Sequence, residues 1–217
     1  TTLGHTPNMQ LPWSGEVLDM MSAALGCDAR GLLPGLWCDK GDMTSHVRYA
    51  FMDAVTKLYD KIFCTQIGDW CRAHNVEYMG HVIEENNANT CVGMGTGHYF
   101  RSLWGQDLAG IDVVLSSLVP GIKGASHTWE PPLYEADDDF FYYELAQLAT
   151  SLAHIDTKKH GRAMCEIFGA YGWQEGLREM KWLADFMMSR GINEYVPHAF
   201  TPKDFPDPDC PPHFYAF

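Results

Sequence analysis

Apolar residues recur along the chain at two different spacings. From Ser45 to His74 they fall mostly three to four positions apart, which predicts a long helix with one buried stripe. Shorter, nearly continuous apolar runs are typical of buried strands. Four such runs occur, at residues 76–83, 111–119, 162–170 and 192–200.

Local signals mark where the helices begin and end. Ser14 is a candidate N-cap for a first helix, which Gly26 would end. The long helix has candidate breaks near Cys64 or Gly68. Further helical periods occupy residues 139–156 and 174–191.

Helices and strands therefore alternate along the chain, which indicates an α/β fold with parallel strands. Four strands make only a small sheet. We expect residues 1–217 to form a single α/β domain that is part of a TIM-type (β/α)8 barrel. We expect this barrel to be incomplete at both ends, so that the chain is a fragment of a larger catalytic domain.

Charge and hydropathy exclude two kinds of partner. The chain has 28 acidic and 15 basic residues and a net charge of −13. This sign repels phosphate backbones, so we do not expect nucleic acid to bind. No apolar run approaches the roughly 18 residues that a membrane span needs, so we expect no membrane contact.

The cysteines bear on the compartment. There are seven, an odd number, and none forms a C-x-x-C pair. This pattern favours reduced thiols and a cytoplasmic location. A secreted or periplasmic location is the alternative for a longer parent chain.

Polar residues follow the apolar runs. Glu84 and Glu85 come directly after the first run, Glu166 lies within the third, and His198 lies near the end of the fourth. The carboxyl ends of parallel strands converge on one edge of a sheet, where ligands of α/β proteins bind. We therefore expect these side chains to line one site.

The alternation of side chains along a strand separates the two glutamates of the first run. His81 and Glu85 share one side, while Glu84 points to the other. If His81 faces the barrel mouth, Glu85 is the candidate catalytic residue. Glu84 is the reserve, because alternation can fail at the end of a strand.

Glu166 lies between Cys165 and Ile167 inside an apolar run. Burying a carboxylate there is costly unless it is paired or functional. The structural alternative is an ion pair with Arg162. The functional interpretation is a catalytic carboxylate, because cleavage of a glycosidic bond needs two carboxyl groups, one as acid and one as base or nucleophile.

Five further residues are candidates for binding a substrate. Histidine and aspartate side chains can hydrogen-bond to sugar hydroxyls, and a tryptophan can stack on a sugar ring. The candidates are His81, His98, Asp112, Trp173 and His198. Structural roles are the alternative for each. No H-E-x-x-H pattern is present, so we predict no metal site.

Several segments, in order, resemble the middle of the catalytic domain of large bacterial glycoside hydrolases of the α-L-rhamnosidase type. They cover most of residues 11–200: LPWSGEVLDMM, LLPGLW, WCRAHNVEYMGHVIEE, LAGIDVV, CEIFGAYGW and MKWLADFMMSRGINEYVPHAF. The resemblance implies a (β/α)8 barrel that hydrolyses a terminal sugar with acidic residues on its rim. It assigns Gly80, His81 and Glu85 to one motif and Glu166 to another. In that family calcium can assist by binding sugar hydroxyls.

The sequence thus predicts a glycoside hydrolase that cleaves a terminal, α-L-rhamnoside-like sugar with Glu85 and Glu166, without a required cofactor. Its partners would be a carbohydrate substrate and the other domains of a larger polypeptide. One alternative is a non-catalytic carbohydrate-binding barrel. Another is a metal-dependent hydrolase that uses His81, His98 and a carboxylate.

Overall fold

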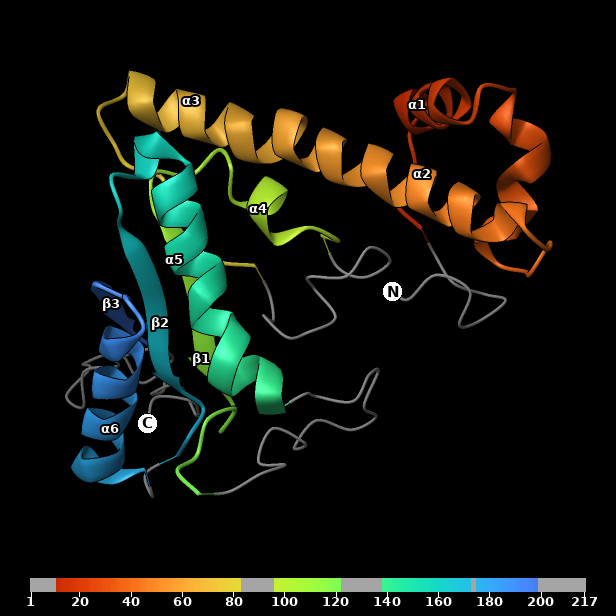
Figure 1. The fold of residues 1–217 in the computed structure, drawn as a ribbon. Helices are drawn as coiled ribbons and strands as arrows, with labels where there is room; N and C mark the ends of the chain where they lie inside the picture. Colours follow the sequence, from red (N-terminus) through yellow and green to blue (C-terminus); the bar gives the residue numbers. More distant parts are fainter. Residues whose placement is uncertain (1–10, 83–95, 122–137, 173–174, 199–217) are drawn as a thin grey trace, which may run out of the picture. The chain divides into compact units, whose positions relative to one another are not determined.

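A computed structural model describes residues 11–82, 96–121, 138–172 and 175–198 (Figure 1). The chain divides into two compact units, one with residues 1–78 and 88–106 and one with residues 79–87 and 107–217. The described part of the first unit is helical, and that of the second is a parallel sheet with helices. No described helix combines the length and the apolar character needed to cross a membrane.

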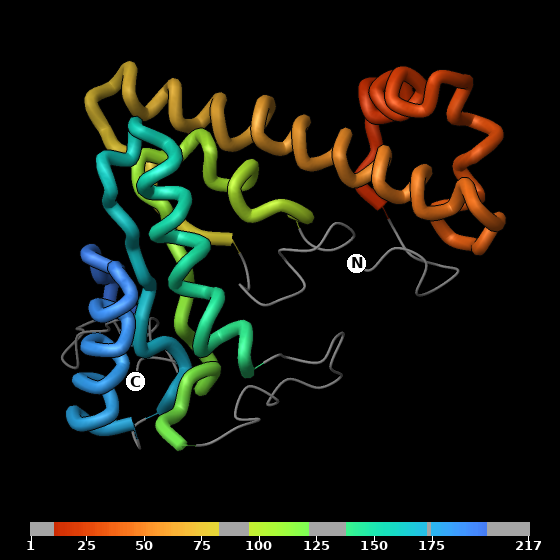
Figure 2. The backbone as a smooth tube through the Cα atoms, viewed as in Figure 1, coloured from red at the N-terminus to blue at the C-terminus, as the bar shows by residue number. Residues whose placement is uncertain are grey.

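The first unit is built around one long helical rod. Its elements are α1 (Gly15–Leu25), the 3-10 helix η1 (Ala29–Leu36), α2 (Met43–Tyr59), the π-helical turn η2 (Asp60–Cys64), α3 (Thr65–Ala73) and α4 (Tyr99–Ser102). Figure 2 shows the backbone running from α2 through η2 into α3 without a bend sharp enough to separate them. The break expected near Cys64 is therefore a change of helical winding within one rod.

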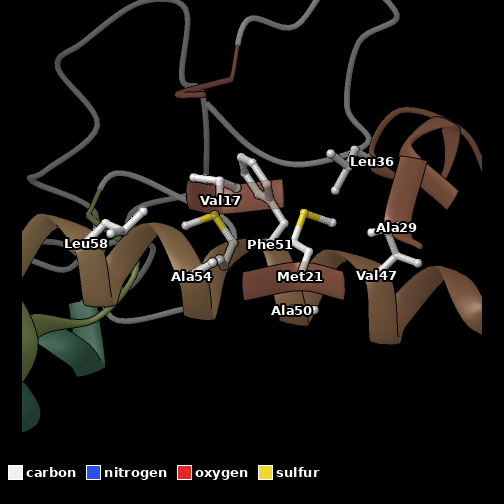
Figure 3. Close-up of a cluster of buried hydrophobic side chains, with 10 residues drawn as sticks. Val17, Met21, Ala29, Leu36, Val47, Ala50, Phe51, Ala54 and Leu58 are labelled. Carbon is white, nitrogen blue, oxygen red and sulfur yellow. The ribbon is translucent and has the colours of Figure 1, made fainter. Parts of the chain in front are cut away.

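The ends of α1 follow the local chemistry of the sequence. The Ser14 hydroxyl accepts a hydrogen bond from the Val17 amide at 3.4 Å. Gly26 ends the helix in the left-handed conformation, with φ of 67°. The inner face of α1 packs on η1 and α2, and Figure 3 shows Val17, Met21 and Phe51 in this apolar cluster. Both predicted ends are confirmed.

The second unit contains a parallel sheet of three strands in the order β1-β2-β3. The strands are β1 (Ala109–Val114), β2 (Ala163–Gly169) and β3 (Glu194–Pro197). The π-helical turn η3 (Phe140–Glu144), α5 (Leu145–Ile155) and the 3-10 turn η4 (Thr157–Lys159) lead from β1 to β2, and α6 (Gly176–Ser189) leads from β2 to β3. Helical crossovers between parallel strands confirm the α/β class.

One face of the sheet carries apolar side chains, and the helices α5 and α6 cover that face. Ile111, Val113, Cys165 and Ile167 are completely buried, and α5 and α6 pack on β2, with α5 also on β1. Figure 1 shows both helices in front of the sheet. Asp112 and Glu166 alternate with these apolar residues and so belong to the opposite face.

The prediction of a strand over residues 76–83 is wrong over its described part, because residues 76–82 form no regular strand. The carbonyl oxygen of Gly80 occupies the space that a Cβ on residue 110 would need. Residues 79–82 therefore pass across this face of β1, and the described sheet has three strands where we expected four. A closed TIM-type barrel is not present among the described residues.

Candidate functional site

The register of the sheet puts acidic residues of two strands side by side. Asp112 of β1 pairs with Glu166 of β2, and Glu166 pairs with Val196 of β3. Partners in a parallel ladder point to the same face, about 4.8 Å apart along the sheet. Asp112, Glu166 and Val196 therefore form one row across the sheet, on the face that residues 79–82 cross.

Glu166 lies between two imidazoles. The Nε2 atom of His81 is 3.0 Å from Glu166 Oε2, and the Nε2 atom of His198 is 3.6 Å from Glu166 Oε1. All three side chains are partly exposed, at 16%, 24% and 27% for His81, His198 and Glu166. The structure thus brings together three residues that the sequence assigned to one site.

The structural alternative for Glu166 was an ion pair with Arg162. The Arg162 guanidinium lies 3.5 Å from the carbonyl oxygen of Asp107. The described ion pairs of Glu166 are with the two histidines. Glu166 is accordingly a carboxylate within reach of solvent and in contact with titratable groups.

The hydrogen bonds of His81 fix where a proton lies. Its Nδ1 atom is 2.7 Å from the carbonyl oxygen of Val82, which can only accept, so Nδ1 carries hydrogen. Its Nε2 atom faces an oxygen of Glu166, at 3.0 Å. The His81 ring therefore links the Val82 carbonyl group to the carboxyl group of Glu166.

His198 is held less firmly. Its amide donates to the carbonyl oxygen of Ile167 at 2.9 Å, which continues the β2–β3 ladder by one residue. Its Nδ1 atom is buried and has no hydrogen-bond partner among the described residues. A buried N–H without a partner is costly, so the hydrogen of the neutral ring belongs on Nε2, which faces Glu166.

The carboxyl ends of β1 and β2 carry strained backbone. Leu115 and Ser116 follow β1 with φ of 61° and 56°, and Phe168 and Ala170 lie at the end of β2 with φ of 77° and 54°. Left-handed backbone costs a residue with a side chain roughly 1–2 kcal/mol. Strain of this kind concentrates at functional sites, because the surrounding structure must hold it in place.

A tyrosine ties the segments after these two strands together. The Tyr171 hydroxyl accepts from the Leu118 amide at 3.2 Å and donates to the Leu118 carbonyl at 3.0 Å. Burial raises the pKa of Tyr171, so the phenol is neutral and can donate. The sequence analysis missed this bridge, since nothing local to either residue predicts the other.

The sequence analysis also missed Glu175, directly before α6. It is only 5% exposed, and neither carboxyl oxygen has a hydrogen-bond partner within the described ranges. Burial, and then the nearby charge of Glu179, raises the pKa of Glu175 to about 7. Near a helix start an acidic residue is ordinary, so its burial could not have been recognised from the sequence.

The remaining predicted residues have different outcomes. Glu84, Glu85 and Trp173 lie outside the described residues. His98 belongs to the other unit, where its Nδ1 accepts from the Arg101 amide at 3.4 Å, burial lowers its pKa, and its ring caps α4. His98 thus caps α4, and its predicted part in substrate binding stays a prediction.

The next feature is the grouping of possible metal ligands among the described side chains. Within those ranges, His, Cys, Asp and Glu do not gather in any group of three or more that could hold a metal ion. Comparison of the chain with models of protein families, with curated proteins and with solved structures found no match. The geometry around Glu166 is therefore the main support for a function.

Proposed function

We propose that this chain is part of a glycoside hydrolase that cleaves a terminal, α-L-rhamnoside-like sugar, with Glu166 as a catalytic carboxylate. One observation carries the proposal: a carboxylate on the middle strand of a parallel sheet contacts the imidazoles of His81 and His198 and stays partly open to solvent. The resemblance to α-L-rhamnosidases supports the same assignment, because Glu166 matches a glutamate of their catalytic region.

The two histidines favour one role for Glu166. Imidazole nitrogens at 3.0 and 3.6 Å can donate hydrogen bonds to a carboxylate. Glycoside hydrolysis needs one carboxylate that stays charged, as base or nucleophile, and one carboxylic acid that protonates the leaving oxygen. Glu166 is then the charged member of the pair.

The sequence names Glu85 and Glu166 as the pair of carboxyl groups and leaves open which of them is the acid. Glu85 follows His81 by four residues in the motif shared with the rhamnosidases, and we propose it as the proton donor, with Glu84 as the reserve. Whether the reaction retains or inverts the anomeric configuration depends on the distance between the two carboxyl groups.

The same proposal extends to the sugar pocket and to the fold. His81, Asp112 and His198 would hydrogen-bond to hydroxyls, while Trp173 and His98 remain candidates from the sequence alone. The three-stranded parallel sheet would be part of a larger (β/α)8 barrel. The free thiols of the described cysteines, buried Cys64 and Cys165 among them, support the proposed cytoplasmic location.

The test is Glu166→Gln in the full-length parent protein. Glutamine keeps the shape of the side chain but carries no charge, so turnover of an aryl α-L-rhamnoside should fall roughly a thousandfold or more. Thermal unfolding should change little. Glu194→Gln is the matched control, because Glu194 lies exposed on the neighbouring β3.

Turnover equal to wild type in Glu166→Gln would contradict the proposed role. If the wild-type protein binds the sugar in calorimetry but does not hydrolyse the aryl glycoside, the carbohydrate-binding alternative replaces hydrolysis. Turnover that chelators abolish and zinc restores would point instead to the metal-dependent hydrolase.

A further inference from the structure

The end of β2 contains a bulge that changes which side chains face Glu166. Val113 of β1 pairs with Ile167, but the next residue, Val114, pairs with Gly169. Phe168 is the extra residue, and its φ of 77° lies in the left-handed region. Without the bulge, Phe168 would share the face of Glu166. With it, Gly169 takes that position.

Gly169 has no side chain, and its neighbours use the space. A Cβ on residue 169 would lie 3.0 Å from Cγ and 3.1 Å from Cδ2 of His198, and 2.8 Å from Cγ2 of Val114. These distances are well inside van der Waals contact. The His198 imidazole therefore lies directly against the bare backbone of residue 169.

Little else fixes His198. It follows a strand of only four residues, and the described backbone contact that holds it is the hydrogen bond from its amide to Ile167. The ring must reach over β2 to bring Nε2 within 3.6 Å of Glu166. Any group on residue 169 would push the ring away from the carboxylate.

We propose that Gly169 is a positioning residue, which seats the His198 imidazole over β2 and so brings it against Glu166. Gly169 touches no reacting atom and acts only through His198. The proposal concerns the carboxylate on which the proposed function rests, but the contact between Gly169 and His198 does not depend on turnover.

The test uses imidazole 15N–1H spectra of the full chain labelled in histidine, recorded above the titration range of the rings. Wild-type His198 should show a single tautomer with hydrogen on Nε2. In Gly169→Ala the displaced ring should lose this signature and populate both tautomers, while the resonances of His74 and His154 in other parts of the chain stay in place.

Val114 provides the matched control, because it is the other side chain that a methyl group at residue 169 would meet. Val114→Ala alone should leave the His198 spectrum unchanged. In the double variant Gly169→Ala/Val114→Ala, the clash with Val114 is relieved and the clash with His198 remains. The altered His198 spectrum should therefore persist. Recovery of the wild-type spectrum would overturn the proposal.

Thermal unfolding is a second test, which also applies if Gly169→Ala folds too poorly for spectra. Overpacking should lower its unfolding temperature by roughly 4 °C. The comparison is made with Val114→Ala present, which removes the other clash: if strain against His198 remains, Gly169→Ala should cost much less when His198→Ala is added. An equal loss in both backgrounds would overturn the proposal. Because neither measurement involves a substrate, an inactive protein would refute the hydrolase and leave the role of Gly169 standing.

Discussion

The two ends of the parallel sheet are built in opposite ways. At the amino ends of the strands, backbone and side chains are tightly bonded: Asn193 accepts from the Ala163 amide at 3.0 Å and donates to the Gly161 carbonyl at 2.9 Å. The Ala109 amide donates to the Arg162 carbonyl at 3.2 Å. At the carboxyl ends lie the contacts of Glu166 with two histidines and four left-handed residues with side chains.

The charged side chains Lys159 and Glu166 also differ in burial. Lys159, just before β2, is completely buried, and its Nζ lies 3.4 Å from an Asp156 oxygen. Burial lowers the pKa of Lys159 to about 8. Glu166 instead keeps access to solvent. The charged group before β2 is thus closed off from solvent, whereas the carboxylate in the middle of β2 is not.

The largest expected effect comes from Lys159→Ala at the amino end. The substitution empties the space of a completely buried side chain and removes one of the two ammonium groups beside Asp156, so the free energy of unfolding should fall by about 3–5 kcal/mol. Urea unfolding measures the loss. The imidazole spectra of His81 and His198 should not change at temperatures where the variant is folded.

Lys158→Ala is the control for this variant. Lys158 also pairs with Asp156, at 3.2 Å, but its side chain is 31% exposed. Because this ammonium group is partly exposed, its pair with Asp156 should contribute at most about 1 kcal/mol. If the two variants lose the same free energy of unfolding, the burial of Lys159 does not stabilise the fold more than the partly exposed Lys158 does.

A smaller, pH-dependent effect is expected at the carboxyl ends, at Glu175. Its pKa is raised from the ordinary 4.5 to about 7, so the folded state holds this proton more tightly than the unfolded state. The resulting stability is fully present below about pH 4.5 and is lost as the pH rises through 7. Glu175→Gln removes that loss and should raise the free energy of unfolding by about 3 kcal/mol at pH 8.

Urea unfolding at pH 5 and pH 8 tests this, with little difference between Glu175→Gln and wild type expected at pH 5. Glu179→Gln is the matched control, since Glu179 contributes a smaller share of the shift than burial does. It should give a smaller gain at pH 8. A gain of the same size at both pH values would argue against a proton on Glu175.

The smallest expected effect concerns the strain itself. Ala170 has φ of 54°, so Ala170→Gly relieves left-handed strain and should raise the free energy of unfolding by about 0.5–1 kcal/mol. The same change at Ala184, inside α6, should lower it by about 1 kcal/mol. If both variants lose stability in thermal unfolding, Ala170 is not strained.

The features that the sequence predicted well are local. Ser14 and Gly26 end α1 through hydrogen bonds and backbone preferences that lie within a few residues. Apolar runs predicted β1 and β2 because burial on both faces leaves that pattern, and the run at residues 192–200 predicted β3 although its residues are only partly buried or exposed. Glu166 was identified because a carboxylate in such a run needs an explanation, and His81 and His198 supply it.

The features that it missed depend on distant parts of the chain. Residues 76–82 have the composition of a strand but form none, and residues 79–82 cross the sheet where Gly80 meets Gly110. The left-handed Phe168 and the bond between Tyr171 and Leu118 arise from pairing between strands and loops far apart in sequence. Pairings between distant segments produce no repeating pattern in the sequence of either segment.

The contact between Gly80 and Gly110 also bears on how freely this protein can vary. Even a methyl group at residue 110 would have to lift the crossing segment, and His81 would travel with it, away from its acid. A survey of tolerated substitutions should therefore find that Gly110 accepts no other residue, although glycine has no side chain. Its importance would lie entirely in the room that it leaves.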